Sequence, residues 1–179
     1  MNLTACDISP NGQHLVASGS SPYDMIMFTI NNSKLIDKFR TSDNKSHTRQ
    51  VTAVKFSHDS NYLISASADS SIFLWEITQK RELNFSGNNV QSRQPISDFK
   101  LSKDSQYMVV SHSQMNYSVV NISIWHIDYQ KKKITLVNES RITESHETDI
   151  YSMSLSPDEK YLASLSIDGI LKFWQLVTF

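Results

Sequence analysis

Two sets of side chains whose types could do chemistry recur in this chain of 179 residues with the same spacing. In each set a His is followed by a Ser 18 residues later, an Asp after 4 more and a Trp after 6 more. A serine, an imidazole and a carboxylate in contact are the components of nucleophilic hydrolysis. With an indole, the same groups can instead satisfy one another in a buried hydrogen-bond network. The two sets are His47, Ser65, Asp69 and Trp75, and His146, Ser164, Asp168 and Trp174.

The duplication favours the structural interpretation. An active site is normally built once, whereas a repeated architecture reproduces a spacing. Neither serine lies in a G-x-S-x-G turn, and both fall inside predicted strands. We therefore predict a structural tetrad, no catalytic residues and no enzymatic activity.

The elements that hold these residues form a pattern present four times. Each copy has an alternating apolar run, a serine, a polar turn, a second apolar run and an apolar–aromatic close. Runs of four to seven residues rich in Val, Ile, Phe, Tyr and Trp between turn signals predict short antiparallel strands and little helix. A fourth run follows each of the first three closes, and the turn-opening serines recur every 45 to 54 residues, the period of a β-propeller blade. These serines are Ser9, Ser57, Ser102 and Ser156.

On its tetrads and period, the chain resembles the WD-repeat (WD40) β-propeller family. The resemblance implies an all-β fold of four antiparallel four-stranded blades in an open arc, with the last blade lacking its outer strand. Ala17 and Val110 stand at the tetrad serine position of the other two repeats, so we expect the first and third blades to lack this network. The expected blades are residues 1–40, 46–87, 94–139 and 145–179 of one partial propeller.

Four blades do not close a ring of seven-bladed geometry, because they span only about 206°. Three alternatives follow. The chain is part of a longer propeller, it completes a ring with another propeller half or a second copy of itself, or it forms a strained four-bladed ring.

Composition excludes several classes of function. A net charge of −1 supplies no general attraction for nucleic acid or anionic membranes. The single cysteine, Cys6, cannot make an internal disulfide, and we expect it in the core of a protein that is intracellular, either cytoplasmic or nuclear. The remaining histidines, among them His112, have no metal-ligand spacing, so we expect no metal and no cofactor.

The resemblance implies a protein-interaction scaffold whose partners bind the face that carries the tetrad His and Asp. The alternative is an RNA-associated subunit of a ribonucleoprotein assembly, supported only by the run Lys131–Lys133. Tyr151 is the strongest single candidate contact, since tyrosine is enriched among binding hot spots. The candidate partner-binding residues are Arg49, Gln50, Thr52, Asp149, Tyr151 and Ile167, with Met115 and Tyr117 in a longer loop of the third repeat.

Overall fold

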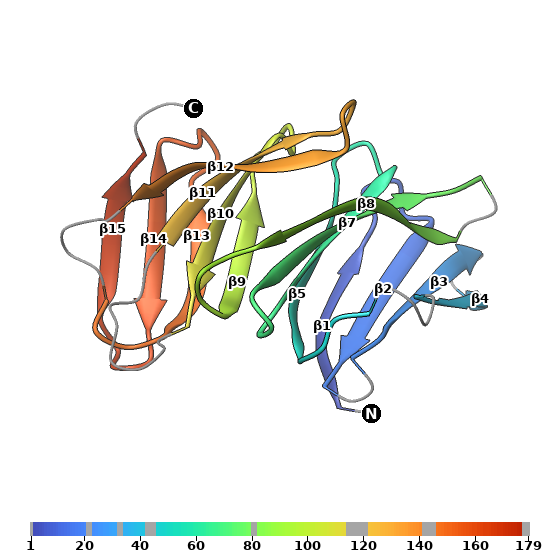
Figure 1. Ribbon diagram of the computed structural model, residues 1–179, viewed down its shortest axis with the longest axis horizontal. Coiled ribbons are helices and arrows are strands. Elements are labelled where there is room, and N and C mark those ends of the chain that lie inside the picture. Colours follow the sequence, from blue (N-terminus) through green and yellow to red (C-terminus); the bar gives the residue numbers. More distant parts are fainter. Residues whose placement is uncertain are drawn as a thin grey trace.

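The fold is a series of four antiparallel sheets, each built from strands consecutive in the chain (Figure 1). The computed structural model describes residues 2–20, 23–31, 34–41, 46–79, 82–113, 122–140 and 146–176. These stretches hold strands and turns, and none of them forms a helix of the length and apolarity that crossing a membrane requires. The strands are β1 (Leu3–Ile8), β2 (His14–Gly19), β3 (Met25–Asn31) and β4 (Lys34–Arg40); β5 (Val51–Phe56), β6 (Tyr62–Ser67), β7 (Ser71–Ile77) and β8 (Leu83–Gln91); β9 (Ile96–Leu101), β10 (Tyr107–His112), β11 (Ile122–Asp128) and β12 (Lys133–Ser140); and β13 (Ile150–Leu155), β14 (Tyr161–Ser166) and β15 (Leu171–Gln175).

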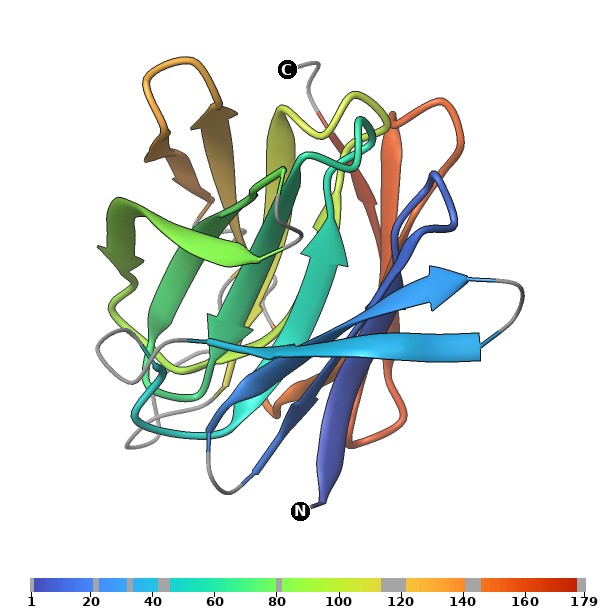
Figure 2. The ribbon, with the colours of Figure 1, turned by 90° about the vertical axis from the view of Figure 1, so that its right-hand side faces the viewer.

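The sheets follow one another as blades in chain order. In Figure 1 the first blade lies at one end of the molecule and the fourth at the other, and Figure 2 shows the same fan of sheets from the side. The first strand of each blade packs beside the first strand of the next, from β1 to β5, β9 and β13. Over the described residues, the first and fourth blades share no comparable packed interface. The prediction of an all-β propeller fold in an open arc is confirmed.

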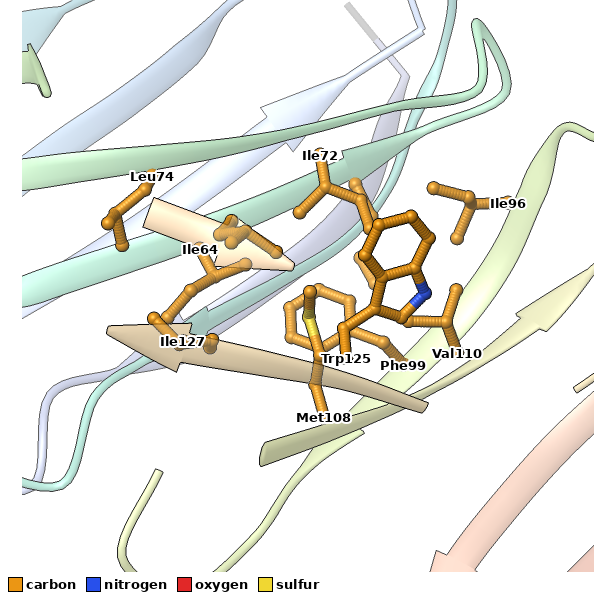
Figure 3. Packing of buried hydrophobic residues seen from close by; sticks show 12 residues of the cluster. Ile64, Ile72, Leu74, Ile96, Phe99, Met108, Val110, Trp125 and Ile127 are labelled. Atoms are coloured by element: carbon orange, nitrogen blue, oxygen red, sulfur yellow. The ribbon is translucent and has the colours of Figure 1, made fainter. Parts of the chain in front are cut away.

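The core lies between blades rather than within them. Figure 3 shows the cluster between the second and third blades, where Trp125 and Met108 of the third blade face Ile64 and Leu74 of the second. Ile64, Leu74 and Met108 have no exposed surface, and Trp125 is 4% exposed. Burying one such aliphatic side chain contributes about 1.5–3 kcal/mol, so these interfaces hold successive blades together.

One turn joins the first two strands of every blade. Its opening serine hydroxyl accepts a hydrogen bond from the backbone N–H five residues later, as in Ser57 with Tyr62 at 3.0 Å. The fourth residue of the turn has a left-handed backbone, with φ near 60° for Ser60, Ser105 and Glu159 and 69° for Gly12. The shared geometry explains why the same turn-opening serine recurs in all four repeats.

These turns are also bonded to one another across the blades. The N–H of Asn11 donates to the hydroxyl of Ser60 at 3.1 Å, and the N–H of His58 donates to the hydroxyl of Ser105 at 2.9 Å. The N–H of Lys103 likewise donates to the carboxylate of Glu159. The acceptor is each time the left-handed residue of the next turn, so each bond joins two neighbouring blades.

The first strand of each blade carries a β-bulge at its second residue, where the register with the next strand shifts by one. A bulge turns an extra side chain out of the alternating pattern. The bulged residues are Thr4, Thr52, Ser97 and Tyr151.

The expectation that Cys6 is a core residue is wrong. Its thiol is exposed, because β1 belongs to the first blade and one face of that blade has no neighbour among the described residues.

Candidate functional site

The second blade brings the four tetrad residues together in one buried network. The indole N–H of Trp75 donates to the hydroxyl of Ser65 at 2.9 Å, and Ser65 lies 2.8 Å from Nε2 of His47. Nδ1 of His47 lies 2.8 Å from the hydroxyl of Ser71 and 3.4 Å from Oδ2 of Asp69. Ser71, which sequence analysis did not single out, donates its hydroxyl hydrogen to Asp69.

The donors of this network run in one direction. The Ser71 hydroxyl gives its hydrogen to Asp69 and so accepts from Nδ1 of His47, which places the imidazole hydrogen on Nδ1. Nε2 therefore accepts the hydrogen of Ser65, whose oxygen accepts from the indole. Burial raises the pKa of Asp69, but hydrogen bonds from His47 and Ser71 outweigh burial. The pKa of Asp69 therefore lies well below its ordinary value, and the carboxylate stays ionised as the end of the chain.

The fourth blade repeats the network without its last link. Trp174 donates to the hydroxyl of Ser164 at 2.8 Å, and Ser164 lies 2.7 Å from Nε2 of His146. Nδ1 of His146 is buried and has no hydrogen-bond partner among the described residues. The residue corresponding to Ser71 is Ile170, which has no hydroxyl to offer. Asp168 bonds instead to Ser166 and to the backbone N–H of Ile170.

The third blade does have a network, so the expectation that it lacks one is wrong. Trp125 donates to the hydroxyl of Ser123 at 2.7 Å, and Ser123 lies 2.6 Å from Nε2 of His112. Here the serine comes from β11, two residues before the tryptophan, and the histidine comes from the end of β10. In the first blade Ala17 and Phe28 occupy the serine and tryptophan positions, which leaves no hydroxyl or indole there.

The geometry opposes a hydrolytic role for the tetrad serines. Ser65 is 0% exposed and Ser164 is 1% exposed, and each is enclosed by its indole and imidazole partners. A nucleophile so enclosed cannot reach a substrate. In the described part of the chain, no three His, Cys, Asp or Glu residues are grouped so as to hold a metal ion.

The candidate partner-binding residues lie where the first strands begin. Thr4 and Thr52 at their bulges donate to backbone carbonyls, and Ser97 bonds to Ser111 at 2.8 Å. The fourth bulge instead carries Tyr151, which is 76% exposed. Ile167 nearby is 67% exposed.

The other candidates are less distinctive. Arg49 and Gln50 are exposed, and Asp149 is partly buried. Met115 and Tyr117 lie outside the described residues.

The lysine run mostly makes contacts within the protein. Lys132 pairs with Glu76 of the second blade at 2.6 Å, and Lys131 pairs with Asp128 at 3.1 Å. Beside them, the hydroxyl of Tyr129 donates to the carbonyl of Ser105 at 2.7 Å. The Lys132–Glu76 pair therefore joins this hairpin to the second blade, whereas the Lys131–Asp128 pair and the Tyr129–Ser105 bond lie within the third.

Comparison with known proteins agrees with the repeats. Residues 38–76 and 138–175 match the family described as WD domain, G-beta repeat. The chain is 30% identical over 135 residues to DNA damage-binding protein CMR1 of Phaeosphaeria nodorum, covering 74% of this chain and 24% of that protein. It is 27% identical over 195 residues to Protein HIR1 of Kluyveromyces lactis, covering 95% of this chain and 21% of that protein. The chain thus spans a quarter or less of the length of these two relatives.

Solved structures show the same fold. A chain of the mitotic checkpoint complex superposes with a TM-score of 0.75 at 20% identity, covering 98% of this chain and 49% of that one. A putative 6-phosphogluconolactonase from Bacteroides fragilis superposes with a TM-score of 0.74 at 17% identity, covering 97% and 50%. The chain thus carries two matched repeats of the WD-repeat family, and the superpositions show that it has the fold of part of a β-propeller.

Proposed function

We propose that this chain is a non-catalytic protein–protein interaction scaffold, part of a larger WD-repeat propeller or multiprotein assembly, and that a protein partner binds the surface around Tyr151 and Ile167. The observation that carries the proposal is the side chain at the fourth bulge. Three bulges hold a small hydroxyl residue bonded within its own or the neighbouring blade, whereas the fourth presents an exposed tyrosine.

The surroundings suit a binding surface. The N–H of Ile167 donates to the carbonyl of Asp149 at 2.9 Å, so the loop carrying Ile167 is tied to the start of β13. Tyrosine and isoleucine held on such a backbone lose little conformational freedom when a partner binds. An exposed tyrosine couples a large apolar area to a hydroxyl, which suits a binding hot spot.

The relatives support the same class of function. One is named as a component of chromatin assembly factor 1, from Gallus gallus, and another as pre-mRNA-processing factor 19, from Caenorhabditis elegans. By analogy we place this chain inside the cell, among protein partners, with its arc completed by further blades. The buried tetrad serines support a role without catalysis.

The test is site-specific crosslinking followed by affinity measurement. A photo-crosslinking residue placed at position 151 in cells should capture a defined protein, and the same residue at Val137, which is 56% exposed on the outer strand β12, should not. With the captured protein purified, Tyr151→Ala should weaken binding at least about 30-fold, as expected for a hot spot of about 2 kcal/mol or more. Tyr23→Ala in the first blade is the matched control. Equal affinities for the two variants would contradict the proposal.

The RNA-associated alternative has lost most of its support, because Lys131 and Lys132 make ion pairs within the protein. Filter binding of RNA that falls steeply with added salt would favour the RNA-associated alternative.

A further inference from the structure

A pocket of about 410 Å³ opens where the first strands of the second, third and fourth blades run into their turns. Three lysines and a histidine line it, and in the described part of the chain no Asp or Glu does. The four basic residues are Lys55, His58, Lys100 and Lys103. The whole chain has a net charge of −1, so this concentration of basic side chains gives one pocket a local field that attracts anions.

The basic residues occupy two positions of the repeat. Lys55 and Lys100 stand two residues before the turn-opening serine of their blades, and His58 and Lys103 directly follow that serine. The same positions of the first and fourth blades hold no basic residue; they are Asp7, Pro10, Ser154 and Pro157. The charge of the pocket therefore comes from the second and third blades, which have neighbours on both sides, and not from the uncovered faces of the outer two.

Ion pairs hold two of the ammonium groups in place. Nζ of Lys55 lies 2.8 Å from Oδ1 of Asp7 in the first blade, and Nζ of Lys100 lies 2.7 Å from Oδ2 of Asp98. The two lysine side chains are nevertheless 38% and 30% exposed. An ammonium group has three donors, so each lysine can pair with its aspartate and still donate to a ligand. A side chain already held in place also loses less conformational freedom when the ligand binds.

The carboxylates of the neighbouring turns are bonded within those turns. Asp59 and Asp104 accept from the serine hydroxyls that open their turns, at 2.5 Å and 2.6 Å, and from the backbone N–H two residues later. The carboxylate of Glu159 accepts from the backbone N–H of Lys103. None of these three acidic residues lines the pocket, so its positive charge faces a ligand directly.

The pocket also has an apolar wall. Leu101 and Leu155, the half-buried last residues of β9 and β13, line it together with Pro10. A free phosphate or a nucleic-acid backbone would pair with the lysines but leave the leucines uncovered. A peptide that carries both acidic and apolar side chains can do both, and covering the leucines adds to its affinity.

We propose that this pocket binds an acidic segment of a partner protein, with Asp or Glu side chains on Lys55, Lys100 and Lys103 and an apolar side chain on the two leucines. Tyr151 lies at the start of β13, whereas the pocket lies at the end of that strand. The inference therefore goes beyond the proposed function, because it gives the scaffold a second surface at the opposite end of the first strands.

The test selects peptides from a displayed library of random sequences on the whole chain. The library is first passed over the Lys103→Glu variant, and peptides that bind this variant are discarded. Peptides then retained by the wild-type chain should be rich in acidic and apolar residues. A synthetic copy of one of them should bind Lys103→Glu at least about 10-fold more weakly than the wild-type chain, because an attraction has become a repulsion. Lys103 is exposed, so circular dichroism should show the variant folded.

The matched control is Lys131→Glu, which makes the same change of charge at a side chain 79% exposed on the β11–β12 hairpin and should bind the peptide as the wild-type chain does. An equal loss of affinity in this control would overturn the proposal, since it would reflect the overall charge alone. Retained peptides without acidic enrichment, or no retained peptide, would also overturn it. So would an oligouridylate of equal charge that binds more tightly than the peptide. Tyr151→Ala should leave the affinity for the selected peptide unchanged, so the two surfaces can fail independently.

Discussion

Three buried serine hydroxyls, those of Ser65, Ser123 and Ser164, each accept a hydrogen bond from an indole and bond to an imidazole. Alanine at any one of them leaves an indole N–H and an imidazole nitrogen buried without a partner. We expect each substitution to lower the free energy of unfolding by about 1–3 kcal/mol, measured by urea denaturation. Ser154→Ala, at an exposed position of β13, is the control and should change stability by less than about 0.5 kcal/mol. Equal effects at buried and exposed sites would contradict the role of the networks.

The unpartnered nitrogen of His146 predicts a stabilising change. Ile170→Ser places a hydroxyl where Ser71 stands in the second blade and gives Nδ1 of His146 an acceptor. Since Ile170 is already 49% exposed, little apolar burial is lost. We expect a gain of about 1 kcal/mol in urea denaturation. Ile170→Ala, which lacks the hydroxyl, should give no gain.

His146 also predicts a dependence of stability on pH. Burial, together with the positive charge of Lys172, lowers the pKa of His146 below its ordinary value. Below about pH 6.5 the unfolded chain therefore binds a proton that the folded chain does not, so stability falls as the pH falls. His146→Gln removes the side chain that takes up this proton. The melting temperatures of the variant and the wild-type chain should therefore differ less at pH 5.5 than at pH 7.5. A difference that does not change with pH would show that His146 is not involved.

Sequence reasoning predicted the four joined residues of the second blade and the joined His146, Ser164 and Trp174 of the fourth, but not that Asp168 stays apart from His146, and it missed two parts of the site. Ser71 and Ile170 were overlooked because the residue two positions after the tetrad aspartate becomes a possible hydrogen-bond partner only when the fold brings the histidine imidazole next to it. The third network was overlooked because the serine was sought at Val110. Ser123 and Trp125 lie two residues apart on one strand and so share a face, a signal present in the sequence, but their approach to His112 depends on the register between β10 and β11.

At the scale of the elements, alternation and turn chemistry predicted the strands, because each short apolar run can bury one face only as part of a sheet. The bulges at the start of the first strands were not predicted, since a register shift leaves no mark in the apolar pattern. Sequence reasoning singled out Tyr151 as a contact residue, but the bulge that turns its side chain out appears only in the structure.

The β11–β12 hairpin makes an ion pair and an aromatic contact with the second blade. The Lys132–Glu76 pair is partly exposed, so Glu76→Gln should cost less than about 1 kcal/mol and less still at high salt. Tyr129 packs on Tyr62 of the second blade with ring centroids 4.7 Å apart, and its hydroxyl donates to the Ser105 carbonyl within the third blade. Tyr129→Phe should cost about 1 kcal/mol, and Tyr129→Ala more, in urea denaturation. A larger effect from Glu76→Gln than from Tyr129→Ala would contradict this ranking.

At the scale of the whole molecule, stability should depend on how many blades cover a position. Leu74 and Phe173 hold the same place in the second and fourth blades but are 0% and 69% exposed. Leu74→Ala should lower the free energy of unfolding by about 2–5 kcal/mol and Phe173→Ala by less than about 0.5 kcal/mol, measured by urea denaturation. Similar costs would mean that the fourth blade is covered within one chain.

The bonded turns have a consequence for any joint made at the first blade. In each internal joint, the turn of one blade donates to the side chain of the left-handed residue in the turn of the next blade. In the turn of the first blade this left-handed residue is Gly12, which has no side chain to accept such a bond. A blade that packs against the open face of the first blade forms an apolar seam without this bond. Apolar contacts weaken on cooling. That seam should accordingly be cold-labile, and a blade docked on it should separate in a chilled solution while the three internal joints, each bonded through its turn, persist.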